Sequence, residues 1–272
     1  MIVSVQTARI ARRQRDFVRA SGPDAEDYLQ RMLSQDVAID LDDAREALLL
    51  TAKARVIAPM VVLRRGPEDF LLSLEAGLGE RVLHELRRFR FAAKVELEPE
   101  VHDAVLVLGG ERPGGVAYPV ADYGEPAWEA LDVAVAGEQV DDGELERLRI
   151  LAGTPRPGLE LDDRVLPAEA GLTERAVSFT KGCYPGQEPI ARLHYRGHAN
   201  RGLRVLRIES DVIPEYNAEL TLDGKPVGRV TSAVRDPEGG ILALAYVRRE
   251  VAEEAELAVT GTVARAVQSR AS

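Results

Sequence analysis

The chain has little cysteine and no long apolar run, and each shortage excludes a class of protein. One cysteine, Cys183, stands among 272 residues. A single thiol cannot build an internal disulfide framework, and it cannot supply the four thiolates that hold an iron–sulfur cluster within one chain. No apolar stretch approaches the roughly 18 residues of a membrane span, and the N-terminus lacks the pattern of a secretory signal. The sequence therefore predicts a cytoplasmic protein that has no membrane partner.

Positive charge is also scarce, except in one segment. The net charge is −10, which argues against direct nucleic-acid binding. Residues 175–208 differ, because they carry seven basic residues and only one acid, Glu188. Two interpretations stay open: chance clustering on a solvated strand, or an anion site.

The first half of the chain mixes helical and strand patterns. We expect residues 1–15, with four arginines, to be loosely held. Apolar spacing predicts helices near 24–33, 75–91 and 144–152. Runs rich in Val, Leu and Ile predict strands at 16–20, 46–51, 55–65, 70–74, 94–97, 103–108, 116–120 and 127–135. Because these elements do not alternate strictly as βαβ units, mostly antiparallel α+β layers are favoured.

The sequence pattern changes near residue 200, where the helical spacing of apolar residues ends. Five strands are predicted, at 204–209, 219–222, 227–235, 241–249 and 256–268, with Gly- and Pro-containing turns between several of them. Short antiparallel strands at this density favour a small barrel or sandwich. We therefore divide the chain into residues 1–200 and a C-terminal β-barrel domain at 201–272.

The stretch from Lys181 to Glu188, KGCYPGQE, crowds unusual chemistry into a loop. Two glycines and a proline favour a shaped loop over a helix interior. A lone cysteine is most often a small buried hydrophobe, but Lys181 and Arg192 offer positive charge that would stabilise a thiolate. Cys183 is therefore the candidate catalytic residue, with a structural role as the alternative.

Two other chemistries have weaker support. A cysteine hydrolase needs a paired base and an orienting group, and no third group is marked beside His194 and His198. The same two histidines have a spacing that binds zinc on a helix. The intervening residues 195–197, however, favour a strand and a turn, so the two imidazoles need not share a face.

The same residues resemble a known family. KGCYPGQEPIAR followed by YRG is similar to the signature of the YgfZ family of folate-binding proteins, which are relatives of the glycine-cleavage aminomethyltransferase and include mitochondrial iron–sulfur assembly factors. Further likenesses lie in SGPDAEDYLQRMLSQDV, LLLTAKARVIAPMVVLRRGPEDFLL, LRILAGTPRPGLEL, LPAEAGL and GRVTSAVRDPEGGILALAYVRRE. Ala54 stands where the family usually has glycine.

The resemblance implies an α+β fold, a three-lobed aminomethyltransferase-like ring of two mixed antiparallel lobes and a C-terminal barrel. Its channel would admit tetrahydrofolate or a one-carbon derivative. Cationic side chains suit the glutamate tail, a tyrosine ring can stack, an amide and a carboxylate can bind the pterin edge, and glycines allow close approach. The expected folate contacts are Lys181, Gly182, Tyr184, Gly186, Gln187, Glu188, Arg192 and Arg196.

Departures from the aminomethyltransferases guide the functional expectation. They carry an acid after the first hairpin, where residues 56–60 here have none, and another in the connector, where Leu151 stands. These differences argue against glycine cleavage. The resemblance instead implies assembly or repair of iron–sulfur proteins, and through it tRNA modification, with iron–sulfur proteins or assembly factors as partners. Two alternatives stay open: one-carbon transfer to an unidentified amine, and a binding module in which folate is incidental.

Overall fold

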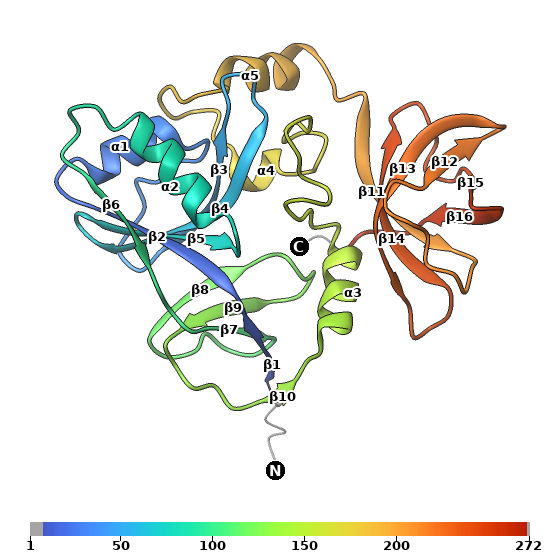
Figure 1. Cartoon of the computed structure of the whole chain (residues 1–272), viewed down its shortest axis with the longest axis horizontal. Helices are drawn as coiled ribbons and strands as arrows, with labels where there is room; N and C mark the ends of the chain where they lie inside the picture. Colours follow the sequence, from blue (N-terminus) through green and yellow to red (C-terminus); the bar gives the residue numbers. More distant parts are fainter. Residues whose placement is uncertain (1–7, 271–272) are drawn as a thin grey trace.

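The computed structural model describes residues 8–270, which form three lobes (Figure 1). Two lobes are built on five-stranded sheets and the third is a closed six-stranded barrel. In Figure 1 the barrel lies on one side and the sheets on the other, with helix α3 (Asp142–Ala152) between them. The predicted fold class, mixed α+β layers followed by an antiparallel barrel, is confirmed.

The first lobe is a sheet covered by two amphipathic helices. Its strand order is β3-β4-β5-β2-β6. The strands are β2 (Arg15–Ser21), β3 (Ala44–Leu50), β4 (Val56–Gly66), β5 (Asp69–Glu75) and β6 (Glu96–Glu100). Helices α1 (Ala25–Met32) and α2 (Gly79–Arg88) bury the apolar stripes that their sequences predict, including Leu29 and Leu86.

The second lobe is a sheet that packs against the first. Its strand order is β10-β1-β7-β9-β8. The strands are β1 (Arg9–Arg13), β7 (Ala104–Leu108), β8 (Val116–Val120), β9 (Ala127–Leu131) and β10 (Glu138–Gln139). Phe17 and Leu71 of the first sheet share one core with Leu106 and Tyr118 of the second. This shared apolar layer fixes the two sheets relative to each other.

The prediction of a loosely held N-terminus is wrong for residues 8–15, while residues 1–7 lie outside the described residues. Strand β1 pairs with β7 and β10 in the middle of its sheet. Its arginines are compatible with this position because carboxylates meet them: Arg9 contacts Glu125 at 2.5 Å and Arg13 contacts Glu75 at 2.6 Å. Those carboxylates lie far from the arginines in the sequence. The arginine-rich segment therefore gave no local indication of a strand.

The third lobe is the predicted C-terminal barrel, with six strands in place of five. In barrel order they are β11 (Arg201–Ile208), β14 (Ile241–Arg248), β13 (Lys225–Arg235), β12 (Glu219–Leu222), β15 (Leu257–Val259) and β16 (Thr262–Ala266). The single strand expected at 256–268 is a hairpin, because Thr260 and Gly261 adopt positive φ angles of 48° and 81°. The other expected helices and strands are present with shifts of a few residues at their ends.

A buried polar cluster joins the connector to the barrel. Arg149 of α3 donates to Glu160 at 3.1 Å and to Ser232 of β13 at 2.8 Å. Ser232 donates to Glu160 at 2.6 Å, and the Glu160 side chain is fully buried. Buried charges of this kind are tolerated only when they are paired and hydrogen-bonded. The cluster therefore makes the barrel's position depend on α3.

Two helices follow the connector, and the second corrects the sequence analysis. Helix α4 is Thr173–Ala176 and helix α5 is Gln187–Arg196. The strand and turn expected at 195–197 are wrong, because α5 continues to Arg196. Pro189 lies in its first turn, where a missing N–H has no helical partner to lose.

Replacing Arg149 with methionine should destabilise the whole chain. Glu160 would keep its buried charge without its cationic partner, and we expect the free energy of unfolding to fall by about 3 kcal/mol or more. The matched control is Arg156→Met, which removes a half-exposed arginine that contacts Glu146 at 3.3 Å and should cost less than about 1 kcal/mol. Urea denaturation measures both variants, and equal losses would contradict the role assigned to the cluster.

Candidate functional site

The KGCYPGQE stretch follows α4 and runs into the first turn of α5, beside the end of the β3–β4 hairpin (Figure 1). Its first support comes from Ser34, which follows α1 and is fully buried. The Ser34 hydroxyl donates to the Ala176 carbonyl at 2.6 Å, and the Ser34 carbonyl accepts from the Ser178 N–H at 2.9 Å. The segment that leads into the stretch is thus bonded to the first lobe.

Lys181 is the second support. Its ammonium donates to the carbonyls of Leu33 and Gln35, at 2.8 and 2.9 Å. Burial lowers the pKa of Lys181 to about 8, and only Asp36 acts in the opposite direction. Its two hydrogen bonds give this side chain a structural role, whether or not it also meets a folate carboxylate.

Tyr184 is the third support, since its ring is buried in the core beneath the loop. The Lys181 ammonium lies 5.4 Å from the centre of that ring, which is a cation–π arrangement. Burial raises the pKa of the Tyr184 phenol to about 12. Its hydroxyl has no hydrogen-bond partner among residues 8–270, so a polar group stays available there.

Gly186 is the fourth support and presses against the β3–β4 hairpin. Its φ angle is +85°, and a Cβ at this position would lie 2.7 Å from the Thr51 carbonyl oxygen and 3.0 Å from the Ala54 Cα. Glycine is therefore required on two counts, conformation and space. The backbone approach that the sequence suggested for a ligand is made here to the hairpin. Ala54 itself adopts φ 58°, where glycine is favoured.

Cys183 is exposed between these supports. The adjoining Gly182 has no atom within 4 Å of the place where a Cβ would be, so the chain is open to solvent beside the thiol. Lys181, Tyr184 and Gly186 each hold the backbone within three residues of Cys183. The structure thus presents one accessible thiol on a loop that is fixed on both sides.

The remaining expected folate contacts lie on α5. Gln187 begins the helix, and Glu188, Arg192 and Arg196 follow at four-residue spacing along one exposed face. Neither arginine forms an ion pair with any residue between 8 and 270. Both arginines are exposed and can contact a ligand or partner, but they do not line the pocket beneath the helix.

Most of the basic segment is engaged within the chain. Arg175 contacts Glu46 at 2.7 Å and Asp122 at 2.9 Å, and Arg201 contacts Glu169 at 3.1 Å. Arg207 contacts Asp236 at 2.7 Å, and Arg204 donates to a backbone carbonyl of the barrel at 2.6 Å. Local charge in the sequence therefore overstates the positive charge available to an anion.

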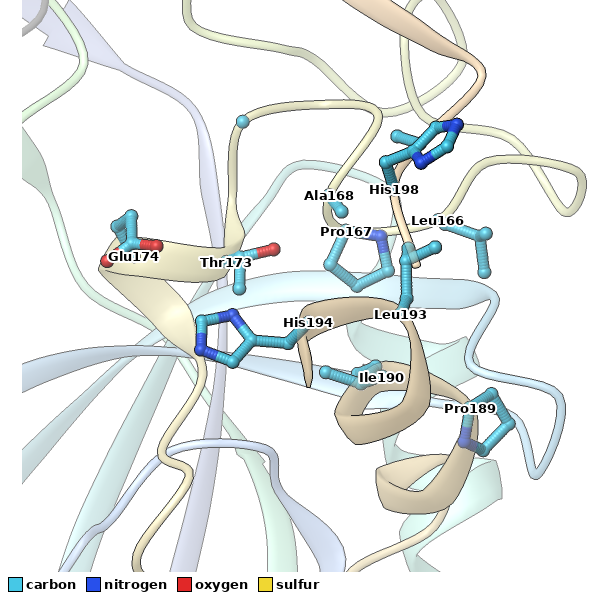
Figure 2. A pocket seen from close by; sticks show the side chains of 12 residues that line it. Leu166, Pro167, Ala168, Thr173, Glu174, Pro189, Ile190, Leu193, His194 and His198 are labelled. Carbon is cyan, nitrogen blue, oxygen red and sulfur yellow. The ribbon is translucent and has the colours of Figure 1, made fainter. Parts of the chain in front are cut away.

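A pocket of about 320 Å³ lies between the inner face of α5 and the connector, and is here named the α5 pocket (Figure 2). Its lining is Leu166, Pro167, Ala168, Gly171, Thr173, Glu174, Pro189, Ile190, Leu193, His194, His198 and Ala199. His194 stacks on Phe179 with ring centres 4.0 Å apart. No cluster of three or more metal-ligating side chains occurs within residues 8–270, so the zinc possibility gains no third ligand.

A second hollow lies between the two sheets and is here named the central cleft. It has an outer cavity of about 510 Å³ and an inner cavity of about 70 Å³, which share Glu46, Val61, Val120 and Arg175. Trp128 and Arg45 line the outer cavity. Thr154 lines the inner one, and its hydroxyl is buried with no partner among the described residues.

No sequence pattern indicated the residues of this cleft. Pro59 and Met60 line the inner cavity, and neither side chain brings a carboxylate to it. Carboxylates come instead from Glu46, Glu75 and Asp122 on other elements. The nearest sequence signal was the proline-rich run that starts at Thr154. Leu151 packs against β11 and β14 of the barrel.

Comparisons with known proteins agree with this architecture. The family model for "CAF17, C-terminal beta-barrel domain" matches residues 197–270. The structure of glycine cleavage system aminomethyltransferase T from Bartonella henselae superimposes with a TM-score of 0.82, covering 97% of this chain and 85% of that one. At 20% identity this match shows the fold.

Relatives in sequence cover most of the chain. A protein of Edwardsiella ictaluri named tRNA-modifying protein YgfZ is 26% identical, over 89% of this chain and 85% of its own length. A Haemophilus influenzae protein without an assigned function is 27% identical, over 81% and 82%. A putative chloroplastic transferase of Arabidopsis thaliana is 38% identical over 39% of this chain and 24% of its own. No helix within residues 8–270 is long and apolar enough to cross a membrane.

The supports of the loop can be tested at Lys181. Lys181→Met leaves the carbonyls of Leu33 and Gln35 without this donor, and we expect a loss of about 2 kcal/mol in the free energy of unfolding. Lys53→Met, which removes an exposed lysine, is the control and should change little.

The pH dependence has a defined sign. The unfolded chain keeps the Lys181 proton up to its ordinary pKa of 10.5, whereas the folded chain releases it near pH 8. Unfolding therefore takes up a proton in this window, and stability from this group rises as pH increases. The stability difference between wild type and Lys181→Met should widen between pH 7 and pH 10. Urea denaturation across that range checks it, and a constant difference would contradict the buried ammonium.

Proposed function

We propose that this chain, a YgfZ-family protein with the aminomethyltransferase fold, binds tetrahydrofolate and uses Cys183 in the assembly or repair of iron–sulfur proteins. The link to tRNA is indirect in this proposal, through iron–sulfur enzymes that modify tRNA, as the name of the Edwardsiella ictaluri relative suggests. The partners are those enzymes or the factors that assemble their clusters. We propose the cytoplasm as the place of action.

The observation that carries the proposal is the exposed thiol on a loop with four separate supports. Lys181, Tyr184 and Gly186 hold the backbone around Cys183, and Ser34 holds the segment before it. A thiolate is the form in which cysteine binds iron or attacks an electrophile. A connecting loop would not need this number of supports for one accessible sulfur.

We place tetrahydrofolate in the central cleft, because that cleft offers more hydrogen-bonding side chains than the α5 pocket. The pterin ring presents N–H donors, and Glu46, Asp122 and the unpartnered Thr154 hydroxyl offer acceptors at the inner cavity. Trp128 offers an aromatic face to the middle of the ligand, and Arg45 a cation to its glutamate tail. When bound, the folate would supply one-carbon chemistry, while these side chains bind and orient it.

The residues of the KGCYPGQE loop flank the thiol along the chain, and those of the exposed face of α5 face solvent. Gly182 adjoins Cys183 in an open part of the loop and Gln187 begins α5 four residues after the thiol, while Lys181, Tyr184 and Gly186 act through the loop that they support. Arg192, Arg196 and Glu188 offer charge on the outer face of α5, where a partner protein can reach them.

One-carbon transfer is the second candidate, favoured by the three carboxylates around the inner cavity. Each has an arginine beside it: Glu46 and Asp122 contact Arg175, and Glu75 contacts Arg15 at 2.7 Å. All three carboxylates of the inner cavity are therefore engaged by an arginine before any substrate binds. Formation of methylene-tetrahydrofolate from an aminomethyl donor would favour this candidate over the first.

Tetrahydrofolate should stabilise the protein through the central cleft. At about one hundred times Kd, a ligand of the native state adds about 2.7 kcal/mol, which corresponds to a rise of about 5 to 10 °C in Tm. Thr154→Val should weaken the apparent affinity about tenfold, because a pterin donor loses its acceptor. Thr173→Val is the matched control, since Thr173 has a similarly unpartnered hydroxyl in the α5 pocket. No shift up to millimolar tetrahydrofolate, or a loss only in Thr173→Val, would contradict the cleft.

Cys183 should be needed for function and unnecessary for folding. Because the side chain is exposed, Cys183→Ala should leave stability within about 0.5 kcal/mol of wild type. We expect this variant to fail to restore iron–sulfur enzyme activity in a strain that lacks the protein, whereas wild type restores it. Full rescue by the variant would assign the thiol a structural role and favour a binding module.

A further inference from the structure

The α5 pocket has an apolar wall and one polar side. Ile190 and Leu193 of α5 face Leu166 and Pro167 of the connector across it (Figure 2). A volume of about 320 Å³ lies within the range of small-molecule sites. The pocket is separate from the central cleft, because the two share no lining residue.

The polar side holds two groups without a hydrogen-bond or ion-pair partner among residues 8–270, a buried hydroxyl and an exposed carboxylate. Figure 2 shows the Thr173 hydroxyl directed toward the space between the connector and α5. Its oxygen is buried and has no hydrogen-bond partner within residues 8–270. Glu174 also lines the pocket and forms no ion pair in that range. The adjacent Arg175 does not neutralise it, because Arg175 contacts Glu46 and Asp122 at the central cleft.

The charge of the lining excludes one class of ligand. Neither lysine nor arginine lines the pocket, so an anion would meet Glu174 without a compensating cation. His194 and His198 can accept or donate hydrogen bonds from their ring nitrogens. The chain as a whole carries −10, which attracts small cations. An apolar wall beside an unpaired carboxylate and an acceptor hydroxyl suits an ammonium group on an apolar body.

We propose that the α5 pocket binds a small organic amine. Its aliphatic or aromatic body lies against Ile190, Leu193 and Pro167, and its ammonium donates to Glu174 and to the Thr173 hydroxyl. This site is independent of folate binding. Since α5 begins four residues after Cys183, an amine bound here contacts the helix that follows the thiol loop directly.

Benzylamine is a suitable probe, with benzyl alcohol and benzoate as its neutral and anionic counterparts. Titration of the full chain by calorimetry and by chemical-shift mapping should give a Kd of about 1 mM for benzylamine, weaker binding of the alcohol and none of benzoate. Glu174→Gln should weaken benzylamine about three- to fivefold and Thr173→Val about threefold. Ala168→Phe, which fills the pocket, should abolish binding.

Matched variants keep the test specific. Glu188→Gln removes a carboxylate from the exposed face of α5, outside the pocket. Thr154→Val removes the unpartnered hydroxyl of the central cleft. Both variants should bind benzylamine like wild type. Tm measurements confirm that every variant is folded. Benzyl alcohol binding as tightly as benzylamine, an unchanged affinity in Glu174→Gln, or shifts located outside the α5 pocket would each overturn the proposal.

Discussion

The half-buried ammonium of Lys181 is the constraint on which the candidate site depends. It joins a loop late in the chain to the carbonyls of Leu33 and Gln35 in the first lobe, and it lies over the ring of Tyr184. Burying an ammonium is unfavourable unless hydrogen bonds compensate it. The two carbonyls and the ring compensate part of this cost, and the pKa of Lys181 still falls to about 8. Together with Tyr184, Gly186 and Ser34, this side chain fixes the loop on which the Cys183 thiol is exposed.

Helix α4 separates two sites of different chemistry. Glu174 faces the α5 pocket, while the next residue, Arg175, reaches Glu46 and Asp122 at the central cleft. Adjacent helical residues point about 100° apart, which is enough to place opposite charges in different cavities. The cleft therefore has arginine beside its carboxylates and suits a ligand with both donors and acids. The pocket has an unpaired carboxylate and suits a cation.

Local patterns predicted much of the fold, and contacts between distant residues determined the remainder. Apolar spacing located α1, α2 and α3, and turn residues located the barrel. Strand β1 was missed because its arginines find their carboxylates in distant segments, and α5 because Pro189 concealed a helical first turn. The motif indicated Cys183. No local sequence pattern indicated that Lys181 would bond to the first lobe or that the Tyr184 ring would be buried in the core. Trp128 lines the outer cavity of the central cleft and Thr154 the inner one, and both cavities form only when the two sheets pack.

The central claim is that folate occupies the cleft between the two sheets while Cys183 acts from a separately fixed loop. A crystal structure of the full chain soaked with tetrahydrofolate tests it most directly. We expect the pterin at the inner cavity within hydrogen-bond distance of the Thr154 hydroxyl, with the Lys181 contacts to Leu33 and Gln35 unchanged. Folate bound in the α5 pocket, or a Lys181 side chain released from those carbonyls to bind the glutamate tail, would contradict it.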